Sequence, residues 1–186
     1  SHCKVRPNYR IRGKVMNFWE KFRPKYLFSC VETISLDWLR EKKYEYIFLD
    51  VDNTITGWNE ETVSSSVGEW LELLLKNEFK IILISNSGNR RLSKIATRFG
   101  IKYISWAAKP SVRPFEKALQ LLGCGDKNKV LVIGDQLFTD IWGGNKMGLN
   151  TALVTPRYQK EFLYTKIIRK IERKVLHLLY LILFDT

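Results

Sequence analysis

The fold is decided by one stretch of the sequence, Phe48-Leu49-Asp50-Val51-Asp52-Asn53-Thr54. The apolar run that leads into it, 46–49, predicts a strand buried on both faces, as in a parallel sheet. Nothing structural requires such a strand to end in two aspartates. In a parallel α/β sheet, however, ligands bind at the carboxyl ends of the strands. We therefore interpret Asp50 and Asp52 as functional residues.

Strand patterns alternate with helical patterns through the middle of the chain. Strands are expected at 45–50, 79–85, 101–106, 129–134 and 150–155. Helices are expected at 35–42, 64–77, 89–99, 112–122 and 138–147. This alternation predicts an α/β fold with a three-layer, doubly wound parallel sheet. The carboxyl ends of the strands then converge on one edge.

Composition excludes several classes of protein. With 45% hydrophobic and 13% aromatic residues, the chain is globular rather than disordered. Cys3, Cys30 and Cys124 are odd in number and lack metal-ligand spacing, which predicts a reducing compartment without a disulfide framework. The basic N-terminus has no continuous apolar core before Trp19, so no secretory signal is expected. We expect an intracellular protein, either cytoplasmic or peripherally associated with a membrane.

The positive charge is concentrated at the two ends of the chain. The net charge is +12; residues 1–26 hold eight Lys/Arg and one Glu, and residues 157–186 hold seven Lys/Arg and three acidic residues. We expect a core at 31–156 between a basic N-terminal arm at 1–30 and a basic amphipathic C-terminal helix at 157–186. The N-terminal arm shows helical apolar spacing that Pro24 interrupts. Such arms indicate an anionic partner, either a membrane surface or nucleic acid.

Polar groups follow four of the apolar runs. They are Asp50, Asp52 and Thr54 after the first, Ser85 and Asn86 after the second, Lys109 after the third, and Asp135 and Asp140 after the fourth. A carboxylate can act as a nucleophile, and a second one can protonate the leaving group and then activate water. Several carboxylates together call for a hard cation such as Mg²⁺, while a hydroxyl and a lysine can hold phosphate oxygens. The set suits phosphoryl transfer.

In order and spacing these groups resemble the haloacid dehalogenase superfamily of phosphatases. The D-x-D-x-T signature is residues 50–54, and the G-D-x-x-x-x-D motif is residues 134–140. The resemblance implies that Asp50 is the nucleophile and Asp52 the general acid/base. It assigns Mg²⁺ to the Asp50 side chain, the Asp52 backbone carbonyl and the Asp135 side chain. The remaining implied roles are phosphoryl binding by Ser85 and Lys109, with Thr54 and Asn86 as further candidates, and support of the metal site or Lys109 by Asp140.

Two arginines, Arg90 and Arg91, open the helix expected after the second strand. One of them could reach a substrate phosphate. Taken singly, each is expected to be a solvated surface arginine.

The resemblance narrows to the YqeG-like phosphatases of subfamily IIIA, through residues 134–145 and 164–173, and covers about 24–174. Eukaryotic relatives in this group are phosphatidylglycerophosphate phosphatases, which implies a phosphorylated lipid substrate at a membrane surface. Family members often carry a cap domain after the first strand or before the lysine. Residues 55–79 and 107–108 are too few for either cap. The sequence therefore predicts an open, capless site that favours large substrates.

The C-terminal residues leave more than one interpretation open. An apolar stripe from Ile167 to Ile182, with basic residues around it, suits a helix lying in a membrane interface. Its apolar end, 175–184, is too short to span a bilayer, which needs about twenty residues. The same stripe could instead pack on the core or on another copy of the chain. The oligomeric state is not predicted.

Two other functions remain as alternatives to a lipid phosphatase. A nucleic-acid end phosphatase ranks lower because aromatic residues are not interleaved with the basic ones in the C-terminal arm. A non-catalytic adaptor of the same fold, which uses the arms to bind a partner, is the other alternative.

Overall fold

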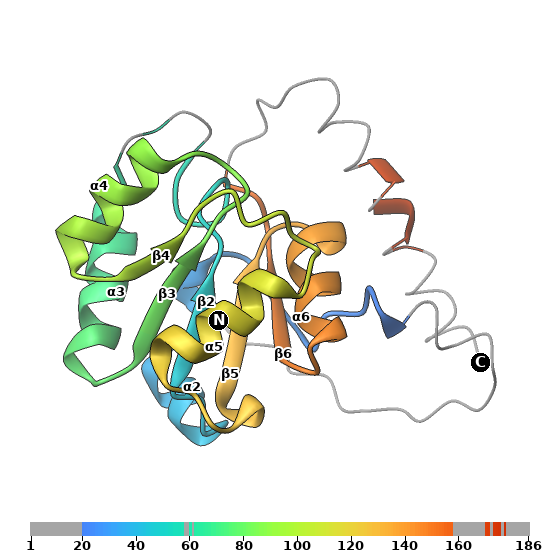
Figure 1. Ribbon diagram of the computed structural model, residues 1–186, viewed down its shortest axis with the longest axis horizontal. Coiled ribbons are helices and arrows are strands. Elements are labelled where there is room, and N and C mark those ends of the chain that lie inside the picture. The colour runs from blue at the N-terminus through green and yellow to red at the C-terminus, as the bar shows by residue number, and fades with distance from the viewer. Residues whose placement is uncertain are drawn as a thin grey trace.

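The computed structural model describes residues 20–57, 60, 62–157, 170–171, 173–175 and 177. At its centre lies a six-stranded sheet with the strand order β1-β6-β5-β2-β3-β4 (Figure 1). All five neighbouring pairs of strands run parallel. The expected α/β fold with a parallel sheet is confirmed, with one strand more than the sequence predicted.

The elements alternate along the chain as expected. The strands are β1 (Tyr26–Phe28), β2 (Tyr46–Leu49), β3 (Lys80–Ile84), β4 (Lys102–Ile104), β5 (Val130–Gly134) and β6 (Asn150–Val154). The helices are α2 (Leu36–Glu41), α3 (Ser65–Lys76), α4 (Asn89–Phe99), α5 (Arg113–Leu122) and α6 (Trp142–Lys146). Two 3₁₀ turns, η1 (Val31–Thr33) and η2 (Lys127–Lys129), and one π-helical turn, η3 (Leu137–Ile141), lie between these elements.

Helices cover both faces of the sheet. Successive residues of a strand point to opposite faces, so a continuous apolar strand has two apolar faces that must be covered. From β2, Ile47 and Leu49 pack into the same core as Leu71 of α3 and Ile95 of α4. Phe48, between them, joins the opposite core, which contains Phe115 of α5. Figure 1 shows α3 and α4 on one side of the sheet and α5 on the other. The strands are therefore buried on both faces, as their continuous apolar sequences predict.

Strand β1 was not expected, because the N-terminal arm showed only helical apolar spacing up to Pro24. It lies at the edge of the sheet beside β6, with Tyr26 opposite Ala152. The backbone N–H of Lys25 donates to the Thr151 carbonyl at 2.9 Å. Just before the strand, the side-chain amide of Asn145 donates to the carbonyls of Glu20, Lys21 and Arg23. These contacts attach the start of the described chain to α6 and β6.

The helix expected at 138–147 is divided between η3 and α6. The wide turn of η3 carries Asp140, and backbone N–H groups of Asp140 and Ile141 both donate to the Gln136 carbonyl. In α6, a Cβ on Gly143 would lie 2.5 Å from the Phe115 ring, so only glycine allows this approach of α6 to α5. Turns of the π type are frequent at functional sites, and this one follows soon after β5.

Most of the two basic arms lies outside the described residues, so the amphipathic helices expected there stay predictions, as do the domain limits at 30 and 156. Among the described residues of the C-terminal arm, Val175 packs, half-buried, against Leu137, Ile141 and Leu153. Within the part of the chain that the structure describes, no helix combines the length and hydropathy needed to cross a bilayer.

Candidate active site

Asp50 stands directly after β2, in the middle of the sheet. Its backbone N–H donates to the Ile133 carbonyl of β5 at 2.9 Å, which fixes it beside the end of that strand. Asn53 then adopts a left-handed conformation, with φ of 62°, which asparagine tolerates better than most residues. The chain turns back, and the Thr54 hydroxyl donates to Asp50 Oδ2 at 2.9 Å. The D-x-D-x-T spacing thus folds Thr54 onto the Asp50 carboxylate.

Lys109 reaches the same carboxylate from the loop after β4. Its Nζ lies 2.6 Å from Asp50 Oδ1, 2.6 Å from Asp140 Oδ1 and 2.7 Å from the Ile84 carbonyl, which accounts for all three ammonium hydrogens. Burial by itself would lower the pKa of Lys109, but the charges and hydrogen bonds of Asp140 and Asp50 outweigh it and raise that pKa. The lysine is therefore a permanent positive charge between two buried aspartates.

Asn86 holds the backbone of Lys109 in place. The Lys109 N–H donates to Asn86 Oδ1 at 2.7 Å, and Asn86 Nδ2 donates to the Lys109 carbonyl at 3.1 Å. The structure therefore uses the amide of Asn86 to position the lysine, and its predicted contact with a substrate phosphate stays a prediction.

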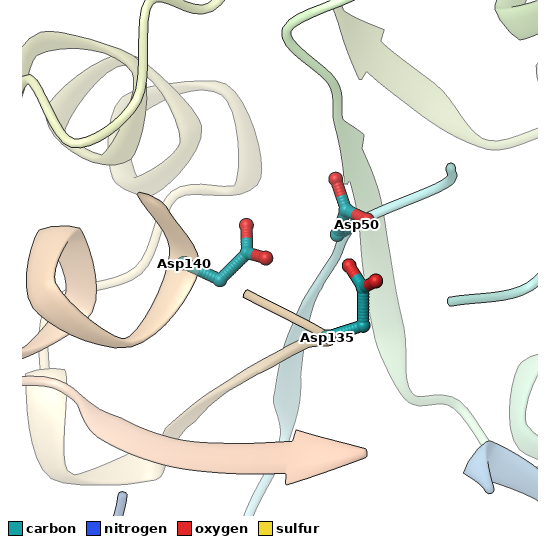
Figure 2. Close-up of side chains that lie close together, drawn as sticks. All are labelled: Asp50, Asp135 and Asp140. Carbon is teal, nitrogen blue, oxygen red and sulfur yellow. The ribbon is translucent and has the colours of Figure 1, made fainter. Parts of the chain in front are cut away.

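Three buried carboxylates, from Asp50, Asp135 and Asp140, meet at this edge of the sheet (Figure 2). Each offers an oxygen within 4.8 Å of the others. The pKa of Asp140 is raised to about 6, chiefly by burial, with Lys109 lowering it and repulsion from Asp50 raising it. One lysine cannot balance three carboxylates, so the cluster carries excess negative charge.

The donor set fits a hard divalent cation. Oxygen-only ligands with excess negative charge are what Mg²⁺ and Ca²⁺ bind. Asp140 also contacts Lys109 through Oδ1, and its Oδ2 accepts from the Gln136 N–H at 3.2 Å. All three carboxylates offer oxygens to such a cation, and the contact of Asp140 with Lys109 is one of the two roles that the resemblance implied for it.

Gly134 explains how Asp140 comes so near. A Cβ on Gly134 would lie 2.3 Å from the Asp140 carboxyl group, so any larger residue would displace it. The G-D-x-x-x-x-D motif therefore pairs a residue without a side chain with the aspartate that folds over it.

A second polar cluster surrounds Asp52. Its Oδ2 accepts hydrogen bonds from Ser85, at 2.9 Å, and from Ser87, and its Oδ1 forms an ion pair with Arg91. Ser85 and Ser87 are two residues apart after β3 and so lie on the same side of the chain. The side chains of Arg91 and Asp52 are only 19% and 15% exposed.

Arg91 was expected to be a solvated surface residue, and this expectation is wrong. The side chain turns inward from the first turn of α4, and burial lowers its pKa, an effect that the negative charge of Asp50 opposes. Arg90, its neighbour, is exposed as predicted. No signal in the sequence separates the two arginines, because their orientation depends on how α4 packs on the sheet.

Arg157, which follows β6, holds the turn formed by residues 50–54, called the nucleophile loop. Its backbone N–H donates to the Asn53 carbonyl at 2.9 Å, its Nε donates to the Thr54 carbonyl at 3.2 Å, and its guanidinium forms an ion pair with Glu32. Sequence reasoning missed this residue, which lies 103 positions from Thr54.

Comparison with known proteins now decides the family. Residues 18–148 match the family described as haloacid dehalogenase-like hydrolase. The chain belongs to the haloacid dehalogenase-like hydrolases. It is also 32% identical over 155 residues to a Bacillus subtilis (strain 168) protein named "Probable phosphatase YqeG", a match that covers 83% of this chain and 90% of the relative.

Solved structures agree on the fold of this hydrolase. An uncharacterized protein from Listeria monocytogenes serotype 4b shares 19% identity at a TM-score of 0.52, with 64% of this chain and 85% of that one covered. A hypothetical protein from Xanthomonas campestris shares 14% identity at a TM-score of 0.51, with 71% and 75% covered. The predicted haloacid dehalogenase-type phosphatase of the YqeG-like group is thus confirmed at the level of the family.

Proposed function

We propose that this haloacid dehalogenase-like hydrolase cleaves phosphomonoesters with Mg²⁺ through an aspartyl-phosphate on Asp50. One observation carries the proposal: the Asp50 carboxylate ends the central strand, held between the Lys109 ammonium and the Thr54 hydroxyl, beside two further buried aspartates. A fixed, charge-compensated carboxylate at a strand end is suited to attack on phosphorus.

Mg²⁺ would be held by the Asp50 side chain, the Asp52 backbone carbonyl and the Asp135 side chain. When bound, it would neutralise the charge of the phosphoryl group and of the carboxylates around it. Lys109 neutralises part of the charge of Asp50 and Asp140 through its two ion pairs. With substrate bound, Lys109 and the Ser85 hydroxyl would hold the phosphoryl oxygens.

The reaction then has two displacements on phosphorus. In the first, an Asp50 oxygen bonds to phosphorus, the bond from phosphorus to the leaving oxygen breaks, and Asp52 gives that oxygen a proton. In the second, Asp52 takes a proton from water, the water oxygen bonds to phosphorus, and the bond to Asp50 breaks, which releases inorganic phosphate. Ser85 holds the Asp52 carboxylate at the end of β3, the strand that pairs with β2.

The replacement Asp50→Asn tests this chemistry. It is expected to reduce hydrolysis of p-nitrophenyl phosphate to background while leaving the thermal unfolding curve cooperative. Asp37→Asn, an equivalent change at an exposed position in the first turn of α2, is the matched control and is expected to retain wild-type activity. Full activity in Asp50→Asn would refute the nucleophile assignment.

We further propose that the substrate is a lipid phosphomonoester at an anionic membrane surface, with phosphatidylglycerophosphate as the best candidate. The chain passes from Leu49 to Ser65 and from Ile104 to Lys109 without room for a cap domain. Both arms are basic. A tryptophan side chain is also exposed to solvent near the lysine in the sequence: Trp106 is 71% exposed and lies three residues before Lys109. Its ring rests on Gly88, where a Cβ would approach it to 2.9 Å.

Tryptophan is suited to the boundary between lipid and water, where one end of the ring is apolar and the other can donate a hydrogen bond. Trp106→Ala is therefore expected to lower phosphate release from phosphatidylglycerophosphate in anionic vesicles, with no matching loss on p-nitrophenyl phosphate. Tyr103→Ala, an exposed aromatic on β4 itself, is the matched control. Equal rates of Trp106→Ala and wild type on vesicles would contradict a role at the membrane.

A further inference from the structure

The ion pair between Arg91 and Asp52 has no place in the two displacements described above. Asp52 faces two different environments through its two oxygens, since Oδ2 accepts from the hydroxyls of Ser85 and Ser87, whereas Oδ1 faces the Arg91 guanidinium. The serines come from the end of β3, and Arg91 comes from the first turn of α4. Arg91 therefore approaches Asp52 from the α4 side of the site.

Lys109 and Arg91 form ion pairs with different carboxylates. Lys109 contacts Asp50 and Asp140, which lie where the phosphoryl group must bind. Arg91 instead forms its ion pair with Asp52, the residue that must touch the leaving oxygen in the proposed reaction. Arg91 is thus the positive charge on the leaving-group side, and Lys109 is the one on the phosphoryl side.

The guanidinium is suited to bind a further anion there. It carries five N–H donors in a rigid plane, and one of its terminal nitrogens, Nη2, makes the contact with Asp52. It is 19% exposed, so it is accessible to a ligand yet sheltered enough for a charge-assisted hydrogen bond to be strong. Its position in the first turn of α4 adds the positive end of the helix dipole to its own charge.

We infer that Arg91 binds an anionic group on the leaving alcohol of the substrate, so that the site selects phosphomonoesters whose leaving group carries a second negative charge, such as a phosphodiester. This inference deepens the proposed function and rests on Asp52 as the group that contacts the leaving oxygen. It makes Arg91 a specificity-determining residue that discriminates between substrates by the charge of the alcohol they release.

Two soluble substrates test the inference without a membrane. Glycerophosphoglycerol phosphate has a phosphodiester on its leaving alcohol and no acyl chains, whereas glycerol 3-phosphate releases neutral glycerol. The ratio of their kcat/KM values is expected to favour the first in the wild type. Arg91→Gln should lower this ratio about tenfold, the value of one charge-assisted hydrogen bond. Arg91→Lys, which keeps the charge, should retain part of the preference.

Arg90→Gln is the matched control, because it removes the same charge from the adjacent, exposed position of α4. The ratio is expected to stay at the wild-type value in this variant. An equal fall of the ratio in Arg90→Gln and Arg91→Gln would overturn the inference, because general surface charge would then explain the preference. An unchanged ratio in Arg91→Gln would overturn it as well.

Binding to the full-length Asp50→Asn protein with Mg²⁺ separates this inference from the proposed function. Calorimetry should show about tenfold tighter binding of glycerophosphoglycerol phosphate than of glycerol 3-phosphate. Equal affinities would overturn the inference, even if both compounds are good substrates of the wild type. Failure of the wild type to hydrolyse either compound would overturn the proposed function instead, and the affinities would still decide the role of Arg91.

Discussion

Replacing Lys109 by methionine should destabilise the protein more than any surface substitution. The ammonium is buried, with its side chain 3% exposed, and lies 2.6 Å from both Asp50 and Asp140. Methionine fills similar space but leaves two buried carboxylates facing each other. Removing one partner of a buried ion pair costs about 3–5 kcal/mol. In a protein of this size each kcal/mol lowers Tm by about 2–4 °C.

The loss of stability in Lys109→Met should also depend on pH, and the burial of Asp140 determines whether it grows or shrinks as the pH falls. Burial, with repulsion from Asp50 added, already raises the pKa of Asp140 to about 6, and removing Lys109 raises it further. A buried carboxyl group whose folded pKa exceeds its unfolded pKa favours the folded state only when it is protonated. The destabilisation in Lys109→Met is therefore complete above the folded pKa and shrinks as the pH falls toward the unfolded value.

Urea denaturation in EDTA, at pH 7.5 and at pH 5, measures both effects. Lys129→Met is the matched control, because Lys129 Nζ also lies 2.6 Å from a carboxylate, that of Glu45, but the pair is exposed. Its replacement should cost less than about 1 kcal/mol at either pH. The double variant Lys109→Met/Asp140→Asn should recover part of the loss, because one unpaired charge is removed with the lysine. A Lys109→Met protein as stable as Lys129→Met at pH 7.5, or equally destabilised at both pH values, would refute the reasoning.

Three further predictions concern the metal, the packing of α6 and the nucleophile loop. EDTA should abolish hydrolysis of p-nitrophenyl phosphate and Mg²⁺ should restore it and raise Tm; unchanged activity in EDTA would argue against a metal. Gly143→Ala should cost about 1–3 kcal/mol in urea denaturation, because the new methyl group meets the Phe115 ring. Gly125→Ala, which meets no atom within 4 Å, should be neutral, and equal costs would contradict the packing. Arg157→Met should lower kcat more than stability, because Arg157 fixes the carbonyl of Thr54; recovery in Arg157→Lys would show that the donor is responsible.

The sequence was sufficient for the central strands because each is a continuous apolar run, and burial on both faces leaves little else possible. It was sufficient for the convergence of Asp50, Lys109, Asp135 and Asp140 because parallel strands place their carboxyl ends at one edge. Predicting that these residues converge therefore required no knowledge of side-chain directions. The structure brings them together as predicted.

Features that depend on tertiary orientation could not be read from the sequence. Strand β1 is three residues long, too short for a periodic pattern, and it forms only because β6 offers an edge. Arg90 and Arg91 are chemically identical neighbours, and the rotation of α4 on the sheet decides which one turns inward. Arg157 acts on a loop more than a hundred positions away. In each case the missing information was the placement of one element on another.

The edge position of β1 has a consequence for the order in which the molecule is assembled. Tyr26–Phe28 leaves the ribosome early, but its partner strand β6 ends at Val154, and the Asn145 amide that holds the preceding turn lies 125 positions after Glu20. Pairs so far apart in sequence form late, because a long loop must close first. During synthesis β1 therefore stays unpaired until β6 has emerged. Until it docks, β6 presents an open edge at which β1 of a neighbouring nascent chain could pair instead, an exchange that would link two molecules through their β1 strands.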